Sequence, residues 1–476
     1  MNKASLFLIL AIPRLLYIYV TDQSAGDTAF YNLVAHNILS GCGFSASASA
    51  TECEPLVGGY FPAYFYFIAL FNSLGFSNKA MAIFTGMAFV ASTLYLYRVL
   101  ARITKKQNLA MWIALVVGLS PLTFGFSRFI LIEPIMSVFS VLILAQVLCL
   151  IAYKRARDWV FCLVLTAIAT YFKPTSIIFI VPLCIAIIYA FGLKNSFKRL
   201  AISGLFLILV VLPWELRTLA LKHESVLSMQ SNAWPPVKHY HAWVKSWAIT
   251  EYERADATFP LWRGELSQIS IKPNYFLSQA EATEAMRLVG EHTREESIWT
   301  TSIDERFLEV VQKRLDSMTI FDRFALFLLQ SASLLLHPGN SYGFPLSLSH
   351  NRQRLDHGLK INDLSTIDKL KSGGKGLIFV YRTFMILIVL WAFVWWIKSR
   401  TLKRDSSLVI STSQSNFHQK QIFEMCTVLS LTLLIAQLVF SVILTFGLEH
   451  RYLSVSFLWI EVAVCLFIFQ IKLFSR

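Results

Sequence analysis

The chain has 476 residues, of which 55% are hydrophobic and only 15% are charged. Soluble globular proteins carry about 25% charged residues, so this composition excludes an ordinary soluble enzyme, a disordered protein and a disulfide-rich scaffold. The mean hydropathy is +0.56, and apolar runs long enough to cross a bilayer recur along the sequence. The sequence therefore predicts an all-α polytopic membrane protein.

The net charge of +14 is unevenly distributed along the chain. Lys and Arg gather in short segments between apolar runs, whereas 19 of the 29 acidic residues lie between Glu215 and Lys375. Short loops rich in Lys and Arg remain on the cytoplasmic side, so the basic clusters indicate topology and not a nucleic-acid-binding surface. We expect membrane lipid as a partner and no nucleic acid.

The basic clusters predict about ten transmembrane helices with both termini in the cytoplasm. Residues 1–214 are expected to form an N-terminal transmembrane module whose first outer loop is 21–79. Residues 215–375 would form a mainly helical extracytoplasmic domain between spans seven and eight, and residues 376–476 would hold the last three spans. The predicted spans are Leu6–Val20, Ala80–Val99, Leu109–Gly125, Ile130–Ala152, Trp159–Phe172, Thr175–Phe191, Leu200–Leu212, Leu377–Ile397, Ile422–Phe446 and Leu453–Ile471.

Two further apolar stretches, Tyr60–Phe76 and Phe321–Leu336, resemble spans in composition. Accepting either one alone would move every later basic cluster to the wrong side of the membrane. We therefore predict that both are helices lying at the outer interface, where aromatic residues such as those of the first stretch are favoured.

Two of the seven cysteines, Cys42 and Cys53, share a polar loop, whereas the other five lie inside apolar runs. An extracytoplasmic loop is an oxidising environment in which these two residues can form a disulfide. A buried cysteine in an apolar run is ordinarily a small hydrophobic residue.

Two carboxylates are candidates for catalysis. Asp27 follows the first span and precedes the predicted short helix 28–39, so it can cap that helix or take a proton from an acceptor hydroxyl. Glu133 lies about one turn into a predicted span, where an ionisable group is costly and by default marks a functional site. The structural alternative for Glu133 is an ion pair with Arg128.

Four other polar residues lie at or near the predicted outer ends of spans, and a fifth lies inside a span. Lys173, Arg217 and Arg451 can bind a phosphate, and the alternative for each is anchoring at the membrane surface. Tyr452 suits the aromatic belt of the interface. Arg14 lies inside the first apolar run, where we expect it to pair with an acidic or phosphate group.

Motifs of soluble nucleotide-binding, metalloprotease and serine-hydrolase folds do not occur in the sequence. His239 and His241 could bind a metal, but two ligands are weak evidence, and surface histidines are the simpler interpretation.

The order and sidedness of several short motifs resemble the GT-C superfamily of glycosyltransferases that use polyprenyl-phosphate sugars. The pattern is most similar to bacterial relatives of protein O-mannosyltransferases and to the lipid A aminoarabinose transferase. The first acidic motif departs from the Asp-Glu pair of many relatives, since Thr28 follows Asp27. The motifs are Arg14 with Gly26-Asp27-Thr28-Ala29-Phe30-Tyr31, Phe61-Pro62-Ala63-Tyr64, Ser127-Arg128-Phe129 with Glu133, Phe172-Lys173-Pro174, Pro213-Trp214 with Arg217, and Glu449-His450-Arg451-Tyr452.

The resemblance implies an inverting transfer of a sugar from a polyprenyl-phosphate-linked donor to a hydroxyl of a lipid, glycan or protein acceptor. Asp27 would be the general base, Glu133 would orient hydroxyls or help to hold a divalent metal, and Lys173, Arg217 and Arg451 would bind the donor phosphate. The expected location is a bacterial inner (plasma) membrane with the site on the periplasmic side. Alternatives are an O-antigen ligase or polymerase and a non-enzymatic lipid or sugar transporter.

Overall fold

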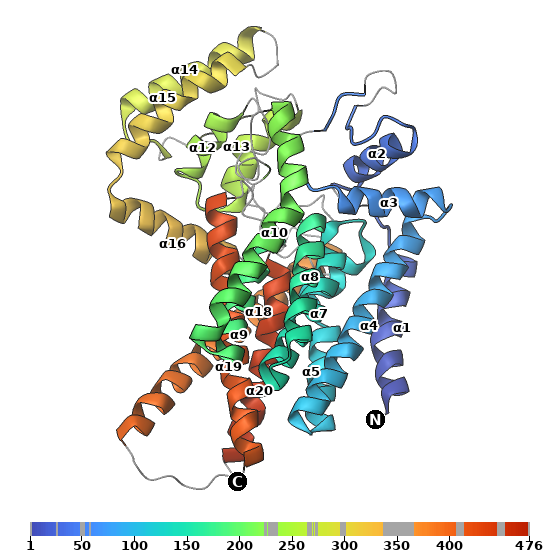
Figure 1. The fold of residues 1–476 in the computed structure, drawn as a ribbon. Helices are drawn as coiled ribbons and strands as arrows, with labels where there is room; N and C mark the ends of the chain where they lie inside the picture. The colour runs from blue at the N-terminus through green and yellow to red at the C-terminus, as the bar shows by residue number, and fades with distance from the viewer. Residues whose placement is uncertain are drawn as a thin grey trace.

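The computed structural model confirms an all-α protein (Figure 1). Within the described residues no strand forms, and Ser45 and Pro55 make one isolated bridge. The structure describes residues 2–24, 27–47, 53–56, 59–222, 226, 237–263, 269, 271, 275–295, 301–336, 366–405, 414–444 and 453–474.

Most of the long helices run side by side in one bundle, and several shorter ones lie across or beyond one of its ends (Figure 1). We call this end the loop end, because it carries the loop after the first helix and the long segment between α10 and α18. The helices are α1 Lys3–Val20, α2 Thr28–Leu39, α3 Ala63–Ser73, α4 Asn78–Thr104, α5 Gln107–Gly118, α6 Pro121–Phe124, η1 Gly125–Arg128, α7 Ile132–Tyr153, α8 Ala156–Phe172, η2 Pro174–Phe179, α9 Ile180–Phe191, α10 Leu193–Lys222, α12 Lys238–Lys245, α13 Glu251–Arg263, α14 Gln279–Glu295, α15 Thr301–Ser317, α16 Ile320–Leu336, α18 Thr366–Asp405, α19 Gln414–Val439, the π-helix η7 Phe440–Leu444 and α20 Ser454–Phe474.

All ten predicted spans coincide with helices of the bundle. By length and composition, seven described helices can cross a membrane, or up to nine if each of two bent pairs counts as one span. The predicted third span is one of these pairs, formed by α5 with α6 and η1 and bent by 41°. The predicted fifth and tenth spans correspond to the shorter helices α8 and α20.

The two apolar stretches assigned to the interface do not form straight crossings. Helix α3 has 11 residues, so it is about 17 Å long and too short for a hydrocarbon core of about 30 Å. It lies across the bundle direction in Figure 1. Helix α16 meets the charged helix α15 at 106°, so the two do not make one continuous span.

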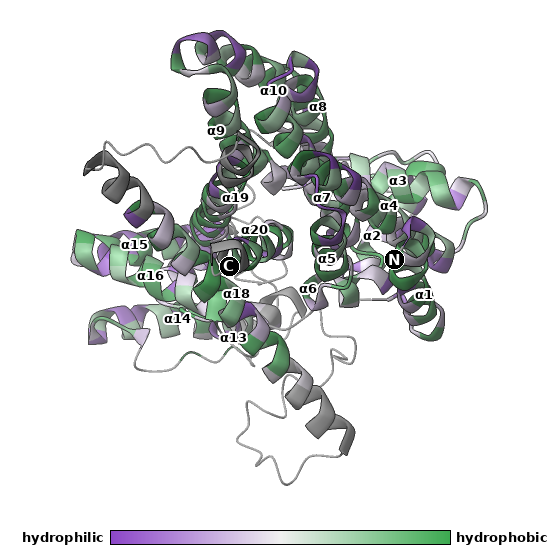
Figure 2. Cartoon of the chain, turned by 90° about the horizontal axis from the view of Figure 1, so that it is seen from below, coloured by the Kyte–Doolittle hydropathy of each residue, from purple (hydrophilic) through white to green (hydrophobic). Residues whose placement is uncertain are grey.

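Helix α7 occupies the centre of the bundle because it is apolar on all sides. Its most apolar window is 78% buried, whereas that of α10 is 17% buried. It packs against α4, α8, α9 and α20. Seen end on, α7 lies between these neighbours, and α10 lies at the periphery with hydrophobic residues along its length (Figure 2). The peripheral helix α10 is therefore apolar as well, although less so than the central helix α7.

The break between α5 and α6 is held by two charged side chains inside the bundle. Arg14 of α1 donates a hydrogen bond of 2.9 Å to the carbonyl of Gly118, and its guanidinium lies over two phenylalanine rings. Glu461 of α20 accepts hydrogen bonds from the hydroxyls of Ser120 and Tyr381, at 2.5 and 2.7 Å. The expected acidic or phosphate partner of Arg14 is thus replaced by a backbone carbonyl and aromatic faces.

Helices α12 to α15 share a hydrophobic core of their own, separate from that of the bundle. Its centre is Trp243, whose indole N–H donates 2.8 Å to Glu281, and the same carboxylate pairs with Arg314 at 2.6 Å. Asp304 accepts backbone N–H groups of the first turn of α12. A separate core agrees with the predicted domain at 215–375, whose boundaries stay a prediction.

His241 is fully buried in this second core, so the interpretation of a surface histidine is wrong for this residue. Burial, followed by the nearby charges of Lys245 and Arg254, lowers the pKa of His241 to about 3. Since the unfolded state then binds more protons between about pH 6.5 and pH 3, the stability of this core falls as the pH falls through that window.

Acidification is therefore expected to lower the melting temperature of the purified protein progressively below pH 6.5, and His241→Phe should weaken that dependence. Differential scanning fluorimetry across pH 7 to 4 measures it, with His239→Phe as the matched control because His239 is only partly buried on the same helix. If the melting temperature of the His241 variant fell with pH as steeply as that of the wild type, other groups would dominate the loss of stability in acid.

Candidate active site

Asp27 lies at the start of α2, but its side chain makes no capping hydrogen bond. Only its backbone takes part in the helix start, since the Asp27 carbonyl accepts the N–H of Tyr31 at 3.0 Å. The next residue, Thr28, donates its hydroxyl to the carbonyl of Ile130 at 3.1 Å. This bond attaches the start of α2 to the segment just before α7, three residues from Glu133.

Glu133 is 4% exposed in the first turn of α7. Its carboxylate pairs with the Lys173 ammonium at 3.1 Å, and the two side chains are 5% and 16% exposed. The alternative ion pair with Arg128 is therefore wrong. Arg128 instead lies over the ring of Phe129, 4.1 Å from its centroid.

Lys173 is positioned by the break between α8 and η2. Pro174 follows it and cannot continue the hydrogen bonding of α8, so Lys173 becomes the extended C-terminal residue of that helix. This conformation places the Lys173 side chain beside Glu133 of α7, 40 residues away in sequence. The two motifs are therefore parts of one site.

The Tyr64 hydroxyl of α3 is influenced by the charges of both Glu133 and Asp27. Its side chain is 1% exposed, and its pKa is raised well above the ordinary value, first by burial and then by the negative charges of Glu133 and Asp27. Both carboxylates thus act on one buried phenol at the loop end of the bundle. The sequence predicted α3 as an interfacial helix but did not assign Tyr64 a function.

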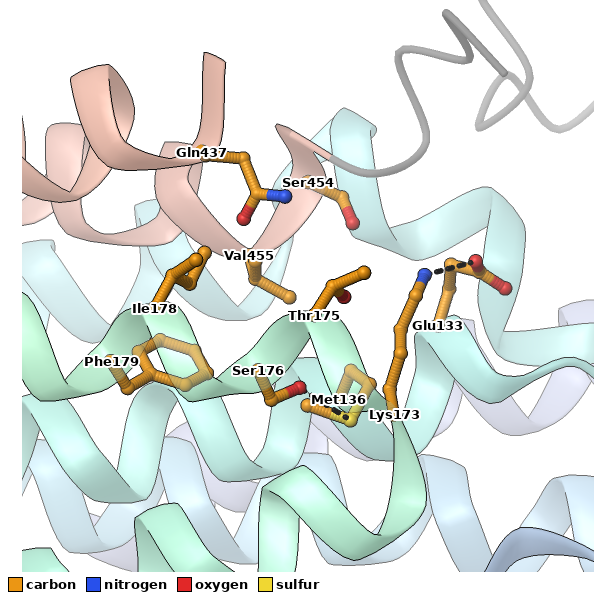
Figure 3. A pocket seen from close by; sticks show the side chains of 10 residues that line it. All are labelled: Glu133, Met136, Lys173, Thr175, Ser176, Ile178, Phe179, Gln437, Ser454 and Val455. Atoms are coloured by element: carbon orange, nitrogen blue, oxygen red, sulfur yellow. Dashed lines mark hydrogen bonds and ion pairs between the residues drawn. The ribbon is translucent and has the colours of Figure 1, made fainter. Parts of the chain in front are cut away.

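A pocket opens beside the Glu133–Lys173 pair (Figure 3). Its empty space is about 290 Å³ when the open solvent at its mouth is counted, but the enclosed part is only about 10 Å³, room for about one water molecule. In Figure 3 the ion pair lies at one side of the pocket and the carboxamide of Gln437 at another. The lining residues are Glu133, Met136, Lys173, Thr175, Ser176, Ile178, Phe179, Gln437, Ser454 and Val455.

Arg217 of α10 lies in an aromatic cluster that reaches back to Tyr64. Its guanidinium donates 3.3 Å to the carbonyl of Leu56 and lies over the ring of Trp214 at 4.5 Å. Ring contacts of 5.0 to 5.5 Å then connect Trp214 with Tyr64 in the order Trp214, Phe44, Phe65, Tyr31, Tyr64. The structure thus brings Asp27, Glu133 and Lys173 to one place, with Arg217 at the far side of this cluster.

Arg451 and Tyr452 lie outside the described residues. Arg14 contacts the Gly118 carbonyl at the end of α5, and its role in the site stays a prediction. Among the described residues, no group of three or more His, Cys, Asp or Glu side chains is arranged to hold a metal ion.

Cys42 and Cys53 form a disulfide in the loop between α2 and α3, with their Cα atoms 5.0 Å apart. The bridge closes a loop beside the Ser45–Pro55 pairing and the hydrogen bond from Leu56 N–H to the Phe44 carbonyl. The disulfide therefore holds the segment that contains Leu56, whose carbonyl accepts the hydrogen bond from Arg217.

Replacing both cysteines by serine is expected to destabilise this loop by about 3 kcal/mol, the loop-closure value for a bridge of this sequence separation. A thermal melt should show a lower midpoint for Cys42→Ser/Cys53→Ser than for the oxidised wild type. Dithiothreitol should lower the wild-type midpoint to the same value and leave the double variant unchanged. Equal melting of oxidised wild type and variant would contradict a stabilising role.

Gln437 and Glu461 were missed by sequence reasoning. Both are polar residues inside apolar runs, and an ionisable or polar group at membrane depth is itself a signal of a specific partner or function. Glu461 contacts Ser120 and Tyr381, whereas Gln437 lines the pocket.

The fold and the site define an all-α membrane protein whose acidic and basic side chains gather at one end of its helix bundle. Residues 55–214, about a third of the chain, match the sequence model of the family described as dolichyl-phosphate-mannose-protein mannosyltransferase. This match confirms the resemblance to the GT-C superfamily of polyprenyl-phosphate-sugar glycosyltransferases. The matched segment contains Tyr64, Glu133 and Lys173.

A solved structure, that of ArnT from Cupriavidus metallidurans bound to undecaprenyl phosphate, is similar to this chain at a TM-score of 0.39 and 11% sequence identity, with 97% of this chain and 77% of that chain covered. No curated protein sequence matches the chain significantly.

Proposed function

We propose that the protein is a membrane glycosyltransferase that moves a sugar from a polyprenyl-phosphate donor to an acceptor hydroxyl. The match of residues 55–214 to a family of lipid-phosphate-sugar transferases supports this class. The observation that carries the proposal is the buried Glu133–Lys173 pair beside a pocket, with the start of α2, where Asp27 lies, attached through Thr28 to the segment before α7. Such a site combines an acidic group for the acceptor with cations for a phosphate.

Asp27 is the general base of the proposed reaction. Its carboxylate takes the proton of the acceptor hydroxyl while the acceptor oxygen forms a bond to the anomeric carbon of the sugar. The bond between that carbon and the phosphate oxygen breaks on the opposite face, so the configuration inverts. The electron pair of the broken bond remains on polyprenyl phosphate, which leaves.

Cations stabilise the leaving phosphate as its charge develops, because hydrogen-bond donors in a water-poor site act strongly on developing charge. Lys173 and Arg217 are the described candidates, and Arg451 is the third. Glu133 holds the Lys173 ammonium in place and orients hydroxyl groups of the donor or acceptor. A divalent metal is not required by this scheme.

The loop end of the bundle faces the periplasm of a bacterial inner membrane in this proposal. The positive-inside rule supports that orientation, because the basic segments lie at the opposite ends of the spans. Residues 215–375 form the extracytoplasmic domain above the transmembrane site, and the acceptor is a lipid, a glycan or a protein hydroxyl.

Membranes containing the protein are incubated with a polyprenyl-phosphate sugar labelled in the sugar, and the anomeric configuration of the labelled product is determined by NMR. An inverted product supports the mechanism. A product with retained configuration would exclude direct attack by an acceptor activated by Asp27. Movement of intact donor across the membrane without any product would favour the transporter.

A further inference from the structure

Apart from the Glu133–Lys173 pair, the polar groups that line the pocket are neutral, and Gln437 lies at the end away from that pair (Figure 3). Gln437 belongs to the last turn of α19, and its side chain extends into the pocket in Figure 3. Thr175 and Ser176 of η2 and Ser454 at the start of α20 contribute hydroxyl groups. The pocket thus brings together hydrogen-bonding groups from three segments distant in sequence.

Gln437 is 2% exposed, yet its carboxamide is poorly satisfied. Its Nε2 donates only a long bond of 3.5 Å to the Ser441 hydroxyl, and its Oε1 has no hydrogen-bond partner among the described residues. A buried polar atom left without a partner costs about 1–3 kcal/mol. A polar atom in that state at the wall of a pocket needs a donor from outside the described residues, which a water or a bound ligand supplies.

The helix is irregular at this position. Two residues after Gln437, α19 ends at Val439, and the chain continues as the π-helix η7, Phe440–Leu444. A π-helical turn inside an α-helix is rare and frequently lies at a functional site, because the extra residue changes the direction of nearby side chains. Lys245 of α12 donates 2.7 Å to the Ile443 carbonyl of η7, so the second core holds this irregular turn in place.

The charges of the pocket favour an uncharged ligand group at this end. The two charged lining residues, Glu133 and Lys173, pair with each other, so the remaining polar lining is neutral. Neutral carboxamide and hydroxyl groups fix the orientation of ligand hydroxyls, whereas a phosphate would require cations. A carboxamide oxygen accepts a hydrogen bond and therefore needs a ligand donor such as O–H.

We propose that Gln437 is a specificity-determining residue that accepts a hydrogen bond from a hydroxyl group of the transferred sugar, within a subsite completed by Thr175, Ser176 and Ser454. The proposal rests on the proposed glycosyltransferase function and names the residues that distinguish the sugar from the lipid phosphate. The phosphate then lies on the Lys173 side of the pocket and the sugar on the Gln437 side.

The test compares binding of two lipids to purified full-length protein in detergent: undecaprenyl phosphate alone, and undecaprenyl phosphate carrying a hexose or an aminopentose. In Gln437→Leu, which has a similar volume and no hydrogen-bonding group, the Kd for the sugar-bearing lipid should rise about tenfold. The Kd for undecaprenyl phosphate alone should remain unchanged. Gln437→Asn, with a shorter carboxamide, should be intermediate.

Gln146→Leu is the matched control, because Gln146 is a glutamine of α7 whose amide bonds Tyr95 and does not line the pocket. It should bind both lipids like the wild type. Equal weakening of both lipids by Gln437→Leu, or an unchanged Kd for the sugar-bearing lipid, would overturn the sugar contact while the proposed function stands. Failure of the wild type to bind any sugar-bearing lipid would overturn the proposed function and the sugar contact together.

Discussion

Asp27→Asn is expected to lower sugar transfer by about 10³-fold without loss of folding, because general-base catalysis contributes about 10²- to 10⁴-fold. The substitution removes the proton acceptor but keeps the size of the side chain. It removes no capping bond, since the Asp27 carboxylate does not cap α2. Transfer is measured with labelled donor, and folding is measured by the melting temperature and the elution volume in detergent.

Asp22→Asn is the matched control for this prediction. Asp22 is an exposed aspartate of the same loop, and its carboxylate accepts hydrogen bonds from the backbone and hydroxyl of Ser24. This variant should retain wild-type transfer. Wild-type transfer by Asp27→Asn would remove Asp27 from the chemistry and make Glu133 the next candidate for the base.

Lys173→Met is expected to lower both stability and transfer. Removing one partner of a buried ion pair leaves the other charge uncompensated, which typically costs about 3–5 kcal/mol. Here the remaining charge is the Glu133 carboxylate, whose side chain is 5% exposed. The melting temperature should therefore fall clearly, and transfer should fall by about 10²-fold because the leaving phosphate loses a cation.

The double variant Glu133→Gln/Lys173→Met separates the two effects. Without the Glu133 charge the site no longer contains a buried carboxylate that has lost its lysine, so most of the lost stability should return, whereas transfer should stay low. Lys79→Met is the control for removing a lysine near the loop end, since Lys79 starts α4 and bonds the carbonyl of Tyr19. Recovery of transfer in the double variant would show that Lys173 serves only to neutralise Glu133.

The sequence predicted the helices well because membrane spans require long apolar runs, and basic loops determine their orientation. The same reasoning predicted that α3 is not an additional span, which agrees with its length of 11 residues, whereas its position at the interface stays a prediction. The separate core around Trp243 was predicted only as a mainly helical domain. Its internal contacts join residues such as Glu281 and Arg314, 33 positions apart, and no local pattern predicts such a pair.

The partners of individual charges were harder to predict. Arg128 is closer to Glu133 in sequence, yet Lys173 makes the ion pair because Pro174 ends α8 beside α7. Arg14 was expected to find an acidic or phosphate partner, and the bend after Gly118 exposes a backbone carbonyl that accepts one of its hydrogen bonds. Gln437 was overlooked because one glutamine changes the hydropathy of a long span very little.

The most direct test of the central claim is the release of free polyprenyl phosphate from a panel of polyprenyl-phosphate sugars by the purified protein in detergent, run in parallel on wild type and Asp27→Asn. We expect release by the wild type with at least one donor, and a loss of about 10³-fold in the variant. No release with any donor by folded wild-type protein would contradict a lipid-phosphate-sugar transferase and favour a ligase or a transporter.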